Sequence, residues 1–396
     1  MTLGKLLAAF IGRRPVTWSF HALVLAVAVA VTASVLLLEQ AASDRMTRDL
    51  GAVDLVIGAK GSPLQLVMSA IFQVDAPTGN IDLADAERFI HNPMVRQAIP
   101  VSMGDNVGGA RIIGTTLAYP ALYKARLAEG SWWDQPMQAV IGAAAAARLG
   151  LKVGDDFVGE HGLVSGSGDL HSATPYHVVG VMAPTGTVVD RVALTDYRSI
   201  WKVHEHPDAD EAAEAARGPQ ITALLITYRS PLGAVILPNQ VKATPDLQPA
   251  SPALEAARLN QIAGASADAI RKLGGALLGL SLIGFIVALS AAVLTRRREL
   301  ALLRALGARP GLLIAVTALE GLLLGGLGGL VGIGLARSGV GLVAAASASS
   351  YALPIPPIGP IDAVLFGVAL LLGLVGSLGP ALAAARINVP DVLGGA

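Results

Sequence analysis

The residues best suited to a chemical task lie at positions 295–311, in the sequence TRRRELALLRALGARPG. This stretch places five arginines and one glutamate between two long segments that are almost free of charge. Its leucines recur at i, i+3 and i+4 spacing, which predicts a short helix with an apolar edge. Gly307 ends such a helix and Pro310 begins the next one. The arginines suit an anionic membrane surface, and the apolar edge suits a groove in a partner protein.

No motif for catalysis is found along the chain. The phosphate-binding pattern G-x-x-x-x-G-K-[ST] is absent, and GAKGSP at 58–63 has neither its spacing nor its strand-to-helix setting, so we interpret it as a turn. The serine hydrolase pattern G-x-S-x-G is absent as well. The chain has no cysteine, which excludes disulfides and thiolate metal sites. We expect a protein that is not an enzyme and that holds no cofactor of its own.

Five of the seven histidines fall between residues 161 and 206. His204 and His206 stand two apart in the acidic stretch HEHPDAD, and imidazole and carboxylate groups are zinc ligands. The spacing matches no standard site, and a solvated arm explains the same residues. His204 and His206 are therefore weak candidates for metal binding, and no firm metal site is predicted.

The composition is that of a membrane protein. Hydrophobic residues make up 53% of the 396 residues and charged residues only 15%, and the mean hydropathy is +0.59. A membrane span needs about 20 apolar residues, and four such runs occur. The predicted order is an amphipathic helix at 1–14, a first transmembrane helix at 15–38, a large outer domain at 39–272, a second transmembrane helix at 273–295, a coupling loop at 296–310, a third transmembrane helix at 311–337, a short outer loop at 338–360, a fourth transmembrane helix at 361–385 and a tail at 386–396.

The distribution of lysine and arginine predicts the orientation. Basic residues precede the first run at Lys5, Arg13 and Arg14, recur through the segment 296–309, and follow the last run at Arg386. Because basic loops stay in the cytoplasm, both termini and the 296–310 loop are expected there, and the large domain outside. Arg337, Arg271 and Lys272 lie on the wrong side, near helix ends where long side chains snorkel to the interface. We favour an uncleaved first helix over a cleaved signal peptide, because its apolar run is long.

The third run contains one charge and several small residues at regular spacing. A lone carboxylate inside a span costs roughly 2.5–3.5 kcal/mol on insertion scales, so Glu320 should be paired, protonated or face a polar cavity. Helix packing and a gating role both remain open for it. Gly321, Gly325 and Gly329, with Gly328 and Gly332, have the small-xxx-small spacing of close helix contacts.

The outer domain mixes strand-like and helix-like pieces. DLVIGAK, HVVGVMA and ITALLITYR read as strands, and LADAERFIH and AAAAARLG read as helices. The predicted fold is therefore an α-helical membrane protein with four transmembrane helices and a large α+β extracytoplasmic domain between the first two. Trp132 and Trp133 either pack in the core of this domain or line a groove.

Several stretches resemble the FtsX-like permease family, of the MacB and LolC/LolE type of ABC transporter subunit. They are RRRELALLRALGARPG with the glycine-rich run that follows, the ending GPALAAARINVPDVL, and the outer pieces IIGTTLAYPALYKARLAEGSWW and YHVVGVMAPTGTVVDRVAL. The resemblance implies a MacB-like periplasmic domain, a second permease subunit, identical or homologous, and a cytoplasmic ABC ATPase dimer. It also implies that the loop between the second and third helices forms a coupling helix that docks on the ATPase. The residues assigned to this coupling are Arg297, Arg298, Glu299, Leu300, Leu303, Arg304 and Gly307.

The expected function is that of an inner-membrane permease subunit. It would transmit ATP-driven change from a separate ATPase, which uses the ATP, to a periplasmic domain that handles a lipoprotein, lipid, peptide or small molecule. A periplasmic or lipoprotein partner fits this scheme, and nucleic acid does not. One alternative is an FtsX-like signalling protein that regulates a periplasmic hydrolase, and another is a component of a zinc-handling ABC system. The alternative for the 296–310 segment is a basic loop that satisfies only the topology rule, but such a loop would not need the ordered sequence ELALLRALGA.

Overall fold

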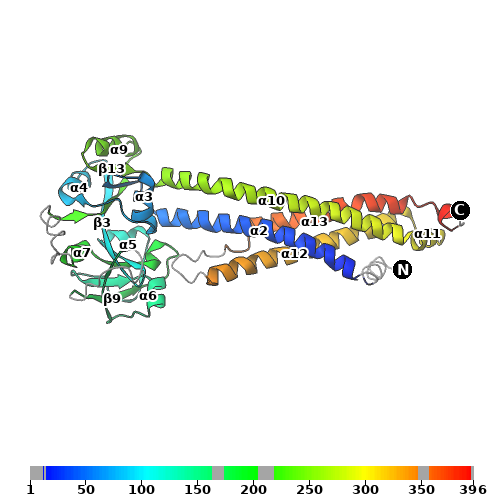
Figure 1. The fold of residues 1–396 in the computed structure, drawn as a ribbon, viewed down its shortest axis with the longest axis horizontal. Helices are drawn as coiled ribbons and strands as arrows, with labels where there is room; N and C mark the ends of the chain where they lie inside the picture. Colours follow the sequence, from blue (N-terminus) through cyan, green and yellow to red (C-terminus); the bar gives the residue numbers. More distant parts are fainter. Residues whose placement is uncertain (1–11, 13–14, 163–173, 204–217, 347–355, 394–396) are drawn as a thin grey trace. The chain divides into compact units, whose positions relative to one another are not determined.

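The computed structural model describes residue 12 and residues 15–162, 174–203, 218–346 and 356–393. It divides into two compact units (Figure 1). The membrane unit comprises residues 1–42, 263–348 and 352–396, and the head comprises residues 43–262 with 349–351. His204, His206 and nearly all of the predicted helix at 1–14 lie outside the described residues.

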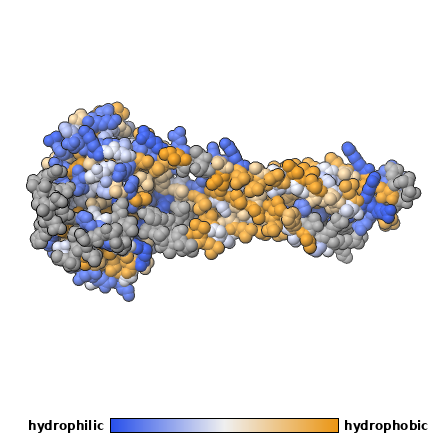
Figure 2. Space-filling model, in the orientation of Figure 1, coloured by the Kyte–Doolittle hydropathy of each residue, from blue (hydrophilic) through white to orange (hydrophobic). Residues whose placement is uncertain are grey.

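Within the described residues, four helices are long and apolar enough to cross a membrane, as predicted. They are α2 (Pro15–Leu50), α10 (Pro252–Thr295), α12 (Pro310–Ala346) and α13 (Pro360–Ala385). Figure 2 shows apolar residues gathered over these helices. On α10, for example, Leu280, Ile283 and Val287 are each more than half exposed. Such a surface suits hydrocarbon rather than water.

Three of these helices are longer than the apolar runs that predict them. Helix α2 continues past residue 38 to Leu50, and α10 begins well before residue 273. Helix α12 continues to Ala346, so the outer loop predicted for 338–360 starts later than expected. Alanine and charged residues beyond the apolar runs favour helix, and helical hydrogen bonding therefore does not stop where hydropathy falls. Helix α2 ends only at Gly51, whose φ is 57°.

A seam of small residues brings α12 and α13 together. A Cβ atom on Gly321 would overlap the carbonyl oxygen of Gly373, and one on Gly325 would lie 2.5 Å from the carbonyl oxygen of Ala369. A Cβ on Gly329 would lie 2.9 Å from the Cβ of Ala369. Glycine at these positions is what allows the two backbones to approach so closely.

A second glycine stripe on α12 contacts α2. A Cβ on Gly328 would lie 2.8 Å from the side chain of Leu25, and one on Gly332 would lie 2.6 Å from the carbonyl oxygen of Ala26. Helix α12 is therefore held closely by α13 on one side and by α2 on another.

The charge of Arg337 is satisfied by an ion pair with the first turn of α13. Its Nε donates to Oδ1 of Asp362 at 3.1 Å, and Nη2 donates to Oδ2 at 2.5 Å. The same guanidinium donates to the carbonyl oxygens of Pro356 and Pro357. This bidentate pair, in place of the snorkelling expected from the sequence, accounts for an arginine near the end of α12.

The head is built on one large sheet. Its strands are β1 (Leu55–Ala59), β3 (Val95–Val107), β4 (Ala110–Thr115), β5 (Leu127–Gly130), β6 (Gln138–Ile141), β7 (Asp156–Phe157), β8 (Glu160–His161), β9 (Tyr176–Met182), β10 (Ala193–Asp196), β12 (Ala223–Tyr228) and β13 (Leu247–Ala250). Across the part of the chain that is described, they follow the order β13-β1-β12-β3-β4-β10-β6-β9-β5, with β7 on β9 and β8 on β3. The β4–β10 and β6–β9 pairs are parallel. A separate pair joins β2 (Ile81–Asp82) to β11 (Gln220–Ile221).

Helices cover both faces of this sheet. They are α3 (Pro63–Val67) continued by the π-helix η1 (Met68–Phe72), α4 (Leu83–Ile90), α5 (Ala118–Leu122), α6 (Ala143–Leu149), the 3₁₀ turn η2 (Val188–Arg191), α7 (Tyr197–Val203) and α9 (Gly233–Ala243). Alternate residues of one strand enter different cores: Val56 packs with residues of α3, η1 and α5, whereas Leu55 and Ile57 pack with residues of α4 and α9. This period of two is that of a strand buried on both sides. The predicted α+β class is confirmed.

The glycine seam yields a stability prediction. Gly325→Ala should lower the melting temperature of the purified protein, because the new Cβ meets the backbone of Ala369, and overpacking costs typically about 1–3 kcal/mol. Gly334 lies on the same helix with no heavy atom within 4 Å of its Cβ position, so Gly334→Ala is the matched control and should be neutral or slightly stabilising. Thermal unfolding in detergent measures both. Equal melting temperatures would contradict the close contact.

Candidate functional site

The segment between α10 and α12 forms a short helix, α11 (Arg297–Ala305). Arg296 precedes it with non-helical φ and ψ angles of −99° and 8°. At the other end Gly307 adopts a φ of 95°, and the N–H of Ala308 donates to the carbonyl oxygen of Leu303 at 3.0 Å. Only glycine adopts such a left-handed backbone conformation without a steric cost, because it has no Cβ atom. Helix α11 is thus closed by local sequence signals at both ends.

One face of α11 is fixed inside the membrane unit. Leu300 is 4% exposed and Ala301 is fully buried. Both pack in a cluster with residues from the ends of the neighbouring helices, namely Val293, Leu313, Val316, Ala384 and Ile387. Leu303 is half-buried against this cluster.

Arg304 secures the same face with hydrogen bonds. Its Nη1 donates to the carbonyl oxygen of Ala385 at 3.1 Å and to that of Ile387 at 2.6 Å. Ala385 is the last residue of α13, and a cation at a helix C-terminus also offsets the negative end of the helix dipole. The short helix α14 (Val389–Leu393) follows, and its Val392 packs against the same cluster.

The structure therefore corrects which residues of α11 can meet a partner. The sequence indicated Leu300, Leu303 and Arg304, but these face the chain's own helices. The opposite face exposes Leu302 by 51% and Leu306 by 85%, and the side chains of Arg297, Arg298 and Glu299 are exposed beside them. Sequence reasoning missed Leu302, although it lies in the same leucine run.

Glu320 pairs with the residue that precedes α11. Its Oε2 lies 3.6 Å from Nη1 of Arg296, and the two residues are 5% and 8% exposed. Both line a cavity together with Trp18 and His21. Pairing is one of the three environments expected for this carboxylate, and a gating role for it stays a prediction.

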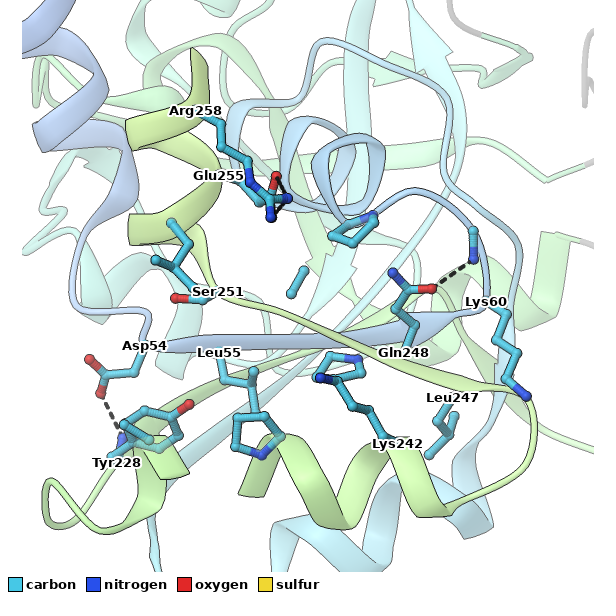
Figure 3. Close-up of a pocket in the computed structure, with 17 residues that line it drawn as sticks. Asp54, Leu55, Lys60, Tyr228, Lys242, Leu247, Gln248, Ser251, Glu255 and Arg258 are labelled. Atoms are coloured by element: carbon cyan, nitrogen blue, oxygen red, sulfur yellow. Dashed lines mark hydrogen bonds and ion pairs between the residues drawn. The ribbon is translucent and has the colours of Figure 1, made fainter. Parts of the chain in front are cut away.

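The head contains a groove beside the edge strand β13. It has a volume of about 850 Å³, within the roughly 300–1,000 Å³ of small-molecule sites. Figure 3 shows β13 running through it, with α9 on one side and the first turns of α10 on the other. The exposed side chains of Lys60, Lys242 and Leu254 border it.

Several polar groups of this groove are held by local hydrogen bonds (Figure 3). The N–H of Gly61 donates to Oε1 of Gln248 at 3.1 Å, and the N–H of Tyr228 donates to Oδ2 of Asp54 at 2.7 Å. Burial, together with the charge of Asp54, raises the pKa of Tyr228 to about 12. Its hydroxyl therefore stays a neutral hydrogen-bond donor at physiological pH. The turn at 58–63, whose sequence does not match a phosphate-binding loop, supplies Lys60, Gly61 and Pro63 to the lining of this groove.

Of the other candidates from the sequence, His204 and His206 lie outside the described residues. In the described part of the chain, no three His, Cys, Asp or Glu side chains group as metal ligands. His161 and His177 each contact one aspartate, with Nδ1–Oδ1 distances of 3.0 Å to Asp105 and 2.7 Å to Asp156. Trp133 is buried in the head core, and Trp132 packs against that core.

Two family models together match most of the chain. The MacB-like periplasmic core domain matches residues 20–231, and the FtsX-like permease C-terminal model matches residues 272–389. The chain belongs to the FtsX/MacB family of ABC transporter permeases. This permease is accordingly a multi-pass membrane protein with a periplasmic-type domain, of the kind found in the inner membrane.

The permease is similar to proteins named pyoverdine export ATP-binding/permease protein PvdT. It is 25% identical over 330 residues to that of Pseudomonas savastanoi pv. phaseolicola (strain 1448A / Race 6), and 26% identical over 337 residues to that of Pseudomonas syringae pv. tomato (strain ATCC BAA-871 / DC3000). Each match covers 79% of this chain and 48% of the relative, so the chain spans about half the length of these curated relatives.

Solved structures with some likeness to the permease include two domains at 12% identity. One is the periplasmic region of MacB from Actinobacillus actinomycetemcomitans, with a TM-score of 0.35 over 53% of this chain and 94% of that chain. The other is the extracellular domain of the ABC-type transporter YknZ from Gram-positive bacteria, with a TM-score of 0.30 over 50% of this chain and 97% of that chain.

The two faces of α11 predict opposite outcomes for two leucines on one helix. Leu300→Ala should destabilise the permease by about 2–5 kcal/mol, because it leaves a cavity in a packed cluster. Leu302→Ala should change stability by less than about 0.5 kcal/mol, because this side chain is half exposed. Melting temperatures of the two purified variants give the comparison, and equal destabilisation would contradict the assignment of faces.

Proposed function

We propose that this permease transmits ATP-driven conformational change from a cytoplasmic ATPase to its head, and that the head handles an exported cargo. The observation that carries the proposal is the division of α11 into two faces. The buried face is bonded to the ends of α12 and α13, and the other face exposes Leu302 and Leu306 among charged residues.

The exposed face of α11 has the chemistry of a docking surface. Leu302 and Leu306 are four residues apart and so lie on one side of the helix. They lie outside the four candidate spans, so the hydrocarbon core of the membrane does not account for their exposure. An amphipathic helix inserts such leucines into a groove of a partner, and the flanking arginines orient it by complementary charge.

The buried face of α11 supplies the route for the motion. Because Leu300, Ala301 and Arg304 are packed against or bonded to neighbouring helices, a displacement of α11 carries the ends of α12 and α13 with it. Helix α12 in turn contacts α2 through Gly328 and Gly332. Val293, near the end of α10, lies in the same cluster as Leu300 and Ala301. A push on this segment thus reaches all four spans.

The direction of transport and the partners are parts of the same proposal. The basic loop at 296–310 and both termini face the cytoplasm, and the head is periplasmic. The relatives are named as export proteins that carry both ATP-binding and permease parts. This name supports export as the direction of transport. A second permease subunit, identical or homologous, completes a dimer, and the groove of the head is the candidate surface for a lipoprotein, lipid, peptide or small-molecule cargo.

Charge placed on the exposed face should abolish ATPase binding. The variant Leu302→Asp with Leu306→Asp should no longer co-purify with the ATPase that accompanies the wild-type permease, while its melting temperature and membrane insertion stay unchanged. Leu232→Asp with Val235→Asp is the matched control, because both residues are 66% exposed on a helix of the head. Co-purification of the first variant at the wild-type level would refute the docking surface.

The proposed orientation is testable by cysteine labelling. The chain has no cysteine, so single replacements carry no background. Leu306→Cys should react with a membrane-impermeant maleimide only after the membrane is opened, whereas Lys60→Cys should react in intact spheroplasts. Labelling of both residues from one side would exclude transmission across the membrane.

A further inference from the structure

A mostly apolar cavity with a few polar groups lies in the membrane unit, near the ends of two of its spans. Its volume is about 270 Å³, and its polar lining comes from Trp18, His21, Arg296 and Glu320. Trp18 is the first residue of the candidate span of α2, and Arg296 directly follows the candidate span of α10. The cavity therefore lies toward the ends of these spans, and tryptophan is typically enriched near the membrane interface.

One donor of a residue that lines this cavity has no acceptor among the residues that the structure describes. The indole Nε1–H of Trp18 is buried and meets no hydrogen-bond acceptor among the described residues. Such a group is costly to leave without a partner. It points to an oxygen atom supplied from outside the protein.

The charged pair of Arg296 and Glu320 lines the same cavity. The 3.6 Å separation of Arg296 and Glu320 is longer than the roughly 2.7–2.9 Å of a charge-assisted hydrogen bond. The cavity thus offers a cation, an anion and an N–H donor within one small space. Its volume equals that of about nine liquid waters, which is the scale of a headgroup rather than of a whole lipid.

We propose that this cavity binds the headgroup of an ethanolamine phospholipid. The phosphate accepts hydrogen bonds from Arg296 and from Nε1–H of Trp18, and the primary ammonium donates to Glu320. The apolar wall, which includes Val287, Leu289 and Leu324, receives the glycerol end of the acyl chains. The preference for ethanolamine over other headgroups depends on its ammonium group. A choline group has no N–H to donate to Glu320, and a purely anionic headgroup would be repelled by the Glu320 carboxylate.

The site gives the lipid a means to act on α11. Arg296 directly precedes that helix and pairs with Glu320 of α12, so occupancy of the cavity would change how firmly the start of α11 is tied to α12. This inference goes beyond the proposed function and does not depend on an ATPase or a cargo.

Native mass spectrometry of the full-length permease tests the lipid. The protein is purified, delipidated and exposed to equal amounts of dioleoyl phosphatidylethanolamine, phosphatidylcholine and phosphatidylglycerol. The wild type should retain the ethanolamine lipid about tenfold more than either other lipid, the factor expected for a hydrogen bond between charged groups. Equal retention of the choline or glycerol lipid would overturn the proposal.

Two variants separate the contacts of the headgroup. Trp18→Phe removes the N–H donor but keeps an aromatic ring, and should reduce retention of all three lipids, whereas Trp132→Phe in the head is the control and should not. Glu320→Gln should abolish the preference for ethanolamine over choline. Unchanged retention by a folded Trp18→Phe protein would overturn the proposal even if Glu320→Gln does not fold.

A soluble headgroup distinguishes the lipid from a free metabolite. Glycerophosphoethanolamine added at the lipid concentration should not displace the bound lipid, because it lacks the acyl chains. Full displacement would overturn the assignment of a lipid as the occupant.

Discussion

The attachment of α11 to the end of α13 is the interaction on which the rest of the mechanism depends. Arg304 donates to the carbonyl oxygens of Ala385 and Ile387, groups that a helix end would otherwise leave to water. Leu300 and Ala301 bury their side chains beside these bonds. A segment that the charge rule alone treats as a loop is thus part of the packed membrane unit, and it cannot move independently of the helices it joins.

The glycines of α12 extend this attachment along the membrane unit. Apolar side chains gain little from leaving lipid for a helix interface, so association inside a membrane depends on close packing. The two glycine stripes of α12 provide that packing against α13 and α2. At the far end of α12, Arg337 and Asp362 form an ion pair, which fixes the register of the same two helices. Contacts near both ends make α12 and α13 suited to move as one body.

Much of the membrane unit follows from the sequence, because hydropathy and charge are local properties. The four spans and α11 are predicted by apolar runs, by Gly307 and by Pro310. The buried face of α11 is not predicted, because Leu300, Leu302, Leu303 and Leu306 cover more than one side of a helix. Contacts with Ala384 and Ile387, at the far end of the last span, decide which leucines are buried. In the head, strands such as ALLITY are recognisable, but the parallel pairing of β4 with β10 joins segments about 80 residues apart that no local pattern connects.

The pair formed by Arg296 and Glu320 gives α11 a second fixed end. A lone carboxylate inside a span costs about 2.5–3.5 kcal/mol on insertion scales, and placing it beside an arginine offsets that cost. The pair joins the start of α11 to α12, and Arg304 joins the end of α11 to α13. With both ends held, a force on the exposed leucines cannot be absorbed by bending the segment. In the proposed function such a force displaces the helices, and in the proposed lipid site a ligand that changes the Arg296 contact would change how much of that displacement reaches α12.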